Sequence, residues 1–143
     1  MAWVEYPYTS IWNQNGILKK PMLEVEVSYN DKSFTQVAII DSGADITVMS
    51  AEVAEAIGID RTVCEKKFVS GIGGSPQEGF LCDIDLKVEK ISGSVTLPVL
   101  FVPGLQFNYL LGQYGFFEQF RVKFEKDRDI FALMKVPKNR KSG

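Results

Sequence analysis

The sequence predicts a mainly β domain with short strands and one or two short helices. Apolar and polar residues alternate over short segments, which is typical of half-exposed strands. Gly, Asn, Asp and Ser clusters separate these segments at short intervals and indicate turns. Strong helix formers gather in one stretch, residues 51–57, so helices are expected to be few.

The composition limits the function before any motif is considered. The chain has 143 residues, is 45% apolar and 24% charged, and carries a formal net charge of −2. This is enough for one domain with a substantial core, and the charge gives no reason to expect a nucleic-acid partner. The chain contains no His, which excludes Ser–His and Cys–His nucleophile pairs and His-based zinc sites. We expect no metal and no other cofactor.

The first 22 residues are rich in aromatic side chains, which include Trp3, Tyr6, Tyr8 and Trp12. We interpret residues 1–22 as an N-terminal arm that packs on the body of the protein or on a partner, with a short edge strand as the alternative. Residues 23–134 are predicted to form the folded domain. Residues 135–143 are basic and are predicted to be a disordered tail.

Alternating hydrophobicity predicts most of the strands in the domain. They are expected at residues 23–29, 34–40, 64–69, 80–88, 94–102, 108–112, 121–126 and 129–134. Ser50 is suited to cap a helix over residues 51–57, and Gly58 is suited to end it. One or two helical turns are expected within residues 113–120.

Two cysteines, Cys64 and Cys82, are too few for a disulfide scaffold or a Cys-only zinc site. They lie almost equally far from a Gly-rich tip at residues 70–76, so they could face each other across a hairpin. Buried thiols are the expectation, and a disulfide that stiffens the hairpin is the alternative. No run is apolar enough to span a membrane, and the start lacks signal-peptide features. We therefore expect a cytoplasmic protein without membrane contact, although a piece of a larger protein would look the same.

The segment from residue 37 to residue 50 carries the most informative pattern. Residues 37–40 predict a buried strand, Asp41-Ser42-Gly43 interrupts it, and residues 46–48 resume strand character. A charged residue between two core strands is costly unless it is paired or functional. A held, partly shielded carboxylate at Asp41 is therefore favoured over an ordinary surface turn.

Three pieces of the chain, in this order, resemble the retropepsins, the single-domain aspartic proteases of retroviruses and their cellular relatives. Asp41-Ser42-Gly43-Ala44-Asp45 is similar to their active-site motif, Gly71-Ile72-Gly73-Gly74 to their flap, and Leu110-Leu111-Gly112 to their apolar-apolar-Gly strand. The resemblance covers residues 23–120. It implies a closed, barrel-like fold with a flap hairpin, and an aspartic endopeptidase activity that needs no cofactor. A phosphate-binding loop at the glycines is disfavoured, because no Lys-Ser/Thr follows and no helix begins there.

The resemblance also implies a symmetric homodimer, because the chain has one Asp-Ser-Gly and the chemistry needs two carboxylates that share a proton. Asp41 would be the general base in one protomer and the general acid in the other. Ser42 would hydrogen-bond across the dimer, and Gly43 would let the substrate backbone approach.

The remaining site residues follow from the same resemblance. Ala44 and Asp45 would contact the main chain of a peptide or protein substrate. The flap residues Gly71, Ile72, Gly73 and Gly74 would close over it and exclude water. Leu110 and Leu111 would support the catalytic loop, and Gly112 would allow close packing. Extended apolar segments are the expected substrates.

Two departures leave a rival interpretation open. Gln113 stands where retroviral members usually have an Arg that pairs with the second Asp of the motif, so Asp45 lacks that partner. Both termini are longer than the short interleaved termini of those members. The rival is a non-catalytic dimerisation or peptide-binding module, which a monomer with peptide affinity unchanged by Asp41→Ala would favour. A self-processing domain cut from a larger chain is a third interpretation.

Overall fold

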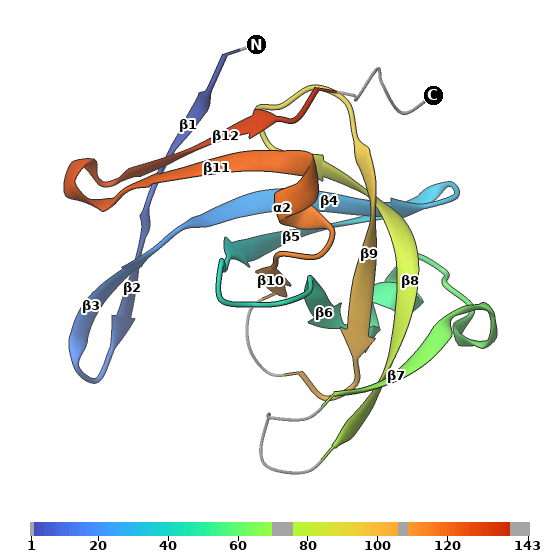
Figure 1. Ribbon diagram of the computed structural model, residues 1–143. Coiled ribbons are helices and arrows are strands. Elements are labelled where there is room, and N and C mark those ends of the chain that lie inside the picture. Colours follow the sequence, from blue (N-terminus) through green and yellow to red (C-terminus); the bar gives the residue numbers. More distant parts are fainter. Residues whose placement is uncertain (1, 70–75, 106–108, 138–143) are drawn as a thin grey trace.

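A computed structural model describes residues 2–69, 76–105 and 109–137 (Figure 1). The strands are β1 (Val4–Pro7), β2 (Thr9–Asn13), β3 (Gly16–Lys20), β4 (Met22–Tyr29), β5 (Lys32–Ile40), β6 (Val48–Ser50), β7 (Glu65–Val69), β8 (Gln77–Val88), β9 (Val95–Val102), β10 (Tyr109–Leu111), β11 (Phe120–Glu125) and β12 (Ile130–Lys135). The α-helices are α1 (Ala51–Ala56) and α2 (Phe116–Gln119), and the 3-10 turns are η1 (Arg61–Val63) and η2 (Lys126–Arg128).

The central sheet closes into a barrel. Its strands follow the order β4-β5-β10-β6-β9-β8, and a further pairing between β4 and β8 closes the ring, while β7 extends from β8. Strand β10 runs parallel to β5 and antiparallel to β6. The expected mainly β, closed-barrel fold is therefore confirmed.

The barrel encloses a core built from the alternating residues of its strands. Val25 and Val27 of β4, Ile84 and Leu86 of β8, and Val99 of β9 are all buried. Successive strand residues point to opposite faces of a sheet, so this period of two places one face of each strand in the core. The expected helix caps are also present: the Ser50 side chain accepts a hydrogen bond from the Glu52 backbone, and Gly58 follows the helix with φ +75°.

A second sheet, in the order β1-β12-β11, packs beside the barrel (Figure 1). The Tyr6 ring of β1 stacks on the Phe131 ring of β12 with centroids 5.2 Å apart. Part of the predicted arm is thus an edge strand that packs on the body. The rest forms a separate two-stranded hairpin of β2 and β3. Strand β12 includes Lys135, the first residue of the segment predicted to be a tail, and residues 138–143 of that segment lie outside the described residues.

Other local predictions were wrong where tertiary pairing decided the outcome. Val37 is 42% exposed, so residues 37–40 are a half-buried strand with only Ala38 and Ile40 inside. Ile46 forms only an isolated bridge, and strand structure resumes at Val48. The one or two helical turns expected within residues 113–120 are, by contrast, confirmed as the single turn α2, which begins after Gly115 at φ +98°.

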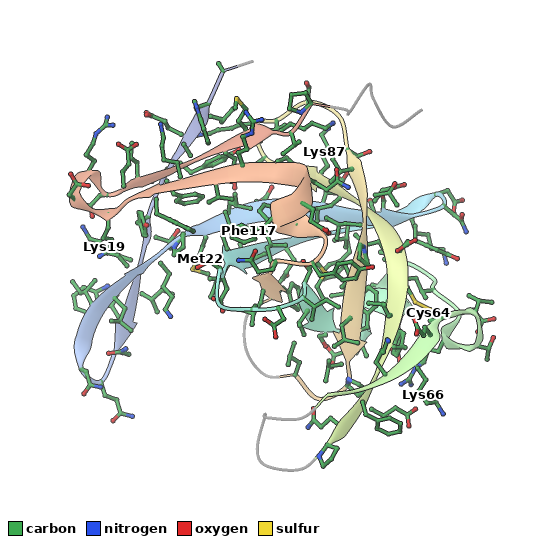
Figure 2. All side chains as sticks on the ribbon, viewed as in Figure 1. Lys19, Met22, Cys64, Lys66, Lys87 and Phe117 are labelled. Carbon is green, nitrogen blue, oxygen red and sulfur yellow. A yellow bond between two sulfur atoms is a disulfide. The ribbon has the colours of Figure 1, made fainter. Side chains whose placement is uncertain are left out.

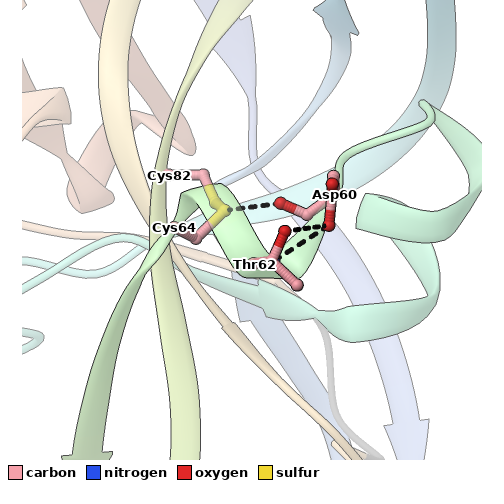
Figure 3. The surroundings of a disulfide bond; sticks show 4 residues. All are labelled: Asp60, Thr62, Cys64 and Cys82. Atoms are coloured by element: carbon pink, nitrogen blue, oxygen red, sulfur yellow. Dashed lines mark hydrogen bonds between the residues drawn. A yellow bond between two sulfur atoms is a disulfide. The ribbon is translucent and has the colours of Figure 1, made fainter.

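Cys64 and Cys82 form a disulfide, so the expectation of buried thiols was wrong (Figures 2 and 3). In the antiparallel β7–β8 pair, Glu65 lies opposite Leu81, and the next pair outward is Cys64 and Cys82. Their Cα atoms are 5.2 Å apart, within the usual range for a disulfide.

The segment before the disulfide is held by an Asp cap. The Asp60 carboxylate accepts hydrogen bonds from the Thr62 hydroxyl at 2.7 Å and the Thr62 backbone at 2.9 Å (Figure 3). These bonds, with the side-chain bond the larger contributor, hold the pKa of the Asp60 carboxyl below its usual value. They fix the 3-10 turn that leads into Cys64.

Candidate active site

The Asp41 carboxylate lies at the end of β5, on a turn that local hydrogen bonds hold. The Gly43 backbone donates to Asp41 Oδ1 at 2.9 Å, and the Ala44 backbone donates to the Asp41 carbonyl at 3.1 Å. The Asp41 backbone donates to the Leu111 carbonyl at 3.0 Å, which ties the turn to β10. The carboxylate is therefore oriented by its own turn and by the neighbouring strand.

Gly112 lets the chain after β10 pass close behind this turn. A Cβ atom at Gly112 would lie 2.7 Å from the Ala44 carbonyl oxygen and closer still to that of Ile46. Such distances do not occur in folded proteins, so any side chain here would displace backbone. The Gly112 backbone also donates to the hydroxyl of Thr47, which is fully buried, at 3.1 Å. The predicted role of Gly112 in close packing agrees with this geometry.

Gln113 holds the turn at two points. Its backbone donates to the Ala44 carbonyl at 2.9 Å, and its side-chain Nε2 donates to the Ser42 carbonyl at 2.8 Å. The sequence identified Gln113 only as the loss of an Arg partner for Asp45. The structure instead assigns it a neutral contact with the backbone of the Asp-Ser-Gly turn. The parallel pairing that sets Leu111 beside Ile40 explains this contact, because it brings the residues that follow β10 beside the turn that follows β5.

The outer side of the turn is accessible. Asp41 and Ala44 are half-buried, whereas Ser42, Gly43 and Asp45 are exposed. A cavity of about 390 Å³ borders Asp41 and extends to the β2–β3 hairpin. Its lining includes Leu18, Lys19, Lys20, Ile39, Asp41 and Leu110. The carboxylate is thus available to solvent, to a substrate or to another chain.

The structure brings together two of the three predicted pieces of the site. Residues 41–45 and 110–113 lie against each other through the hydrogen bonds given above. The third piece, Gly71, Ile72, Gly73 and Gly74, lies outside the described residues. The two strands that lead to it, β7 and β8, pair as predicted, with Val69 opposite Gln77.

Strand β10, behind the turn, carries a tyrosine whose pKa is changed by its surroundings. Burial, and to a lesser degree the nearby Glu52 carboxylate, raise the pKa of the Tyr109 hydroxyl in β10.

Among the residues that the structure describes, no three His, Cys, Asp or Glu side chains gather in a group that could hold a metal ion. The described helices are also too short or too polar for any of them to cross a membrane.

A closed barrel and a strand-held Asp-Ser-Gly turn define the class of retropepsin-like aspartic proteases. A family model described as aspartyl protease matches residues 25–114, which is more than half of the chain. The chain therefore belongs to the aspartyl protease family, and it is an aspartic-type endopeptidase.

Two solved structures are similar to this chain, and the first supports the fold. A retropepsin-like aspartic protease from Rickettsia conorii superposes with a TM-score of 0.59 at 15% sequence identity, covering 92% of this chain and 98% of that one. EIAV protease in complex with the inhibitor HBY-793 matches with a TM-score of 0.46 at 22% identity, covering 66% of this chain and 82% of that one. No curated protein matches the sequence.

Proposed function

We propose that the protein hydrolyses peptide bonds as a homodimer in which Asp41 of one chain and the partner's Asp41 form the catalytic dyad. The observation that carries the proposal is the Asp41 turn itself. Hydrogen bonds from β10 and Gln113 hold it from behind, and Asp41 is half-buried between the buried Ile40 and the exposed Ser42 and Gly43. The chain supplies one such turn, and two carboxylates sharing a proton require a second.

The chemistry follows from the shared proton. The ionised carboxylate removes a proton from a water molecule as the water oxygen attacks the peptide carbonyl carbon. The protonated carboxylate of the other chain gives its proton to the carbonyl oxygen, and a neutral tetrahedral diol results. The newly protonated carboxyl then gives its proton to the amide nitrogen, while the other carboxylate takes a proton from a diol hydroxyl. The C–N bond breaks to give a carboxylic acid and an amine, and the dyad again holds one proton. Positioned proton transfer of this kind contributes about 10²–10⁴-fold to the rate.

The neighbours of Asp41 take supporting roles in this proposal. The exposed hydroxyl of Ser42 is available to bond across the dimer, and Gly43 leaves the space above the carboxylate free for a peptide backbone. Ala44 and Asp45 line the path of the substrate main chain. Gly71, Ile72, Gly73 and Gly74 would close over the substrate, and closure would exclude water from the dyad.

Substrates bind as extended strands in this proposal, since a peptide lying between the turn and a closing hairpin offers its backbone for pairing. Extended apolar segments are the expected preference. A cleavage profile dominated by charged or folded sites would contradict this part of the proposal.

The direct test is cleavage of a mixed peptide library between pH 4 and pH 7 by the wild type and by Asp41→Asn. The variant keeps shape and most hydrogen bonding but removes the proton chemistry, so we expect wild-type cleavage and none by the variant. Asp31→Asn, at the exposed turn between β4 and β5, is the matched control and should retain full activity. Equal cleavage by the wild type and Asp41→Asn would contradict the proposal. The absence of peptide cleavage by all three proteins would favour a non-catalytic binding module.

A further inference from the structure

The β2–β3 hairpin stands apart from the rest of the fold (Figure 1). Its two strands pair only with each other among the described strands. An isolated two-stranded hairpin is at best marginally stable in water. It is anchored at its base, where Lys19 Nζ lies 2.8 Å from Asp129 Oδ2 and the Tyr8 backbone donates to the Asp129 carbonyl. These contacts set its direction but leave Trp12, Ile17 and Leu18 exposed, whereas Ile11 is half-buried.

Both faces of the hairpin carry apolar side chains. Trp12 lies opposite Ile17 in the register, and Ile11 lies opposite Leu18, so one pair is on each face. Trp12 is 76% exposed, Ile17 51% and Leu18 46%. Tryptophan is among the residues that most often dominate the binding energy of protein interfaces. Exposed apolar side chains grouped on one element indicate an interaction surface.

The hairpin lies on the side of the barrel where the Asp41 turn opens. The Ile40 backbone donates to the Pro21 carbonyl at 3.0 Å, so the chain leaving the hairpin is bonded to the residue before Asp41. Leu18 and Lys20 line the same cavity as Asp41.

The charges of the two neighbouring segments are opposite. Residues 9–20 contain Lys19 and Lys20 and no acidic residue, whereas residues 37–50 contain Asp41 and Asp45 and no basic residue. In a two-fold symmetric dimer, the same surface of each chain contacts the other chain. The basic hairpin of one chain can therefore face the acidic segment of its partner, and the reverse contact forms at the same time.

The C-terminal strand β12 is not available for the same purpose. In the sheet β1-β12-β11, the C-terminal strand β12 is central and is paired on both edges within one chain. Strand exchange through β12 would have to break these pairings first.

We infer that the β2–β3 hairpin is a dimerisation arm that packs its apolar side chains on a second copy of this chain, beside the Asp41 turn. The inference rests on the proposed function, because that function requires a second Asp41 at this side of the barrel. A stable dimer interface buries about 800 Å² per protomer, and a buried aromatic side chain contributes about 150–250 Å² of it. Trp12 is therefore expected to be the main anchor.

The test is the dimer dissociation constant from sedimentation equilibrium of the wild type and of Trp12→Ser/Ile17→Ser. Loss of an interface anchor raises this constant by about 30-fold or more. The matched control is Val63→Ser, which removes a 70% exposed apolar side chain from η1 and should leave the constant unchanged. Each single hairpin variant is measured too, and far-UV circular dichroism with thermal unfolding checks that every variant is folded.

The outcomes separate this inference from the proposed function. A folded hairpin variant that dimerises as tightly as the wild type, or a wild type that stays monomeric, overturns the dimerisation arm. A hairpin variant that dissociates supports the arm even if no protein cleaves peptides, since Asp41→Asn should dimerise like the wild type. Cleavage that fails in the dilute hairpin variant and returns at high protein concentration supports both.

Discussion

Gln113 is the residue that fixes the position of the Asp41 turn from behind. Its side chain donates to the Ser42 carbonyl at 2.8 Å, and its backbone donates to the Ala44 carbonyl. An amide carries no charge, so this contact is independent of pH. We therefore interpret Gln113 as a positioning residue that acts on catalysis through the backbone of the turn.

We expect Gln113→Glu to lower kcat about five- to tenfold at pH 6 with little change in KM, because an ionised carboxylate cannot donate to the Ser42 carbonyl. A protonated carboxyl can donate, and an ordinary Glu titrates near pH 4.3. The deficit relative to the wild type should therefore shrink as the pH falls from 6 to 4. The pH profile of kcat for the two proteins measures this effect.

Gln119→Glu is the matched control. The Gln119 side chain donates to the Thr96 carbonyl at 3.3 Å, so the same substitution breaks a similar exposed bond away from the turn. We expect its kcat profile to follow that of the wild type. A pH-independent loss of kcat in Gln113→Glu, or an equal loss in both variants, would contradict a positioning role.

At the residue scale, the sequence predicted the members of the turn but only part of its support. Asp41 and Gly112 were identified from their motifs, and Gly112 lies where only a glycine fits. The contact from Gln113 to Ser42 was missed, because it depends on the parallel register of β5 and β10, which no local pattern reveals. The roles of residues 71–74 stay predictions, since these residues lie outside the described structure.

At the scale of elements, the disulfide joins the base of the β7–β8 hairpin. Cys64 precedes β7, Cys82 lies within β8, and the bond closes a loop with a sequence separation of 18 residues. Such a crosslink reduces the conformational freedom of the unfolded chain. It also keeps the two strands that lead toward residues 71–74 paired at one end.

We expect reduction of the disulfide to lower the free energy of unfolding by about 2–4 kcal/mol, as is typical for a loop of this size. Urea unfolding of the wild type with and without dithiothreitol measures this change. Cys64→Ser/Cys82→Ser is the control, because its stability should match the reduced wild type and should not respond to the reductant. An unfolding free energy of the wild type that is the same in both conditions would contradict the prediction.

The disulfide also bears on where the protein acts. Stable disulfides are typical of oxidising compartments and are rare in the cytoplasm. The expected cytoplasmic location is untested and stays a prediction. Thiol labelling of the protein in cell extracts prepared with rapid alkylation would determine which redox state it adopts there.

Element prediction succeeded where local pattern and packing agree. The alternation of β4 and β9 predicted both strands, because one face of each lies in the core. It was less accurate where long-range pairing decides the structure. Strand β1 exists because it pairs with β12, more than a hundred residues further along the chain, and the aromatic residues around it did not reveal that partner. The disulfide likewise depends on the β7–β8 register.

At the scale of the whole molecule, the described part of the protein is a closed barrel with the Asp41 turn and the projecting β2–β3 hairpin on the same side. The barrel could be predicted from the ordered set of strands together with the resemblance of residues 41–45 and 110–112 to a known site. The outward path of the β2–β3 hairpin could not, because nothing within residues 9–20 specifies what they pack against. In the proposed dimer, the β2–β3 hairpin of each chain packs on the other chain and brings the two Asp41 turns together.

The measurement that tests this account most directly is the activity of a fixed amount of wild type as inactive Asp41→Asn is added and allowed to exchange. If each site needs Asp41 and the partner's Asp41, random pairing with an equal amount of variant leaves about half of the initial activity, and a ninefold excess leaves about one tenth. Co-purification of differently tagged copies confirms that exchange has occurred. Activity that stays constant after confirmed exchange would mean that one chain forms a complete site, and it would contradict the shared dyad.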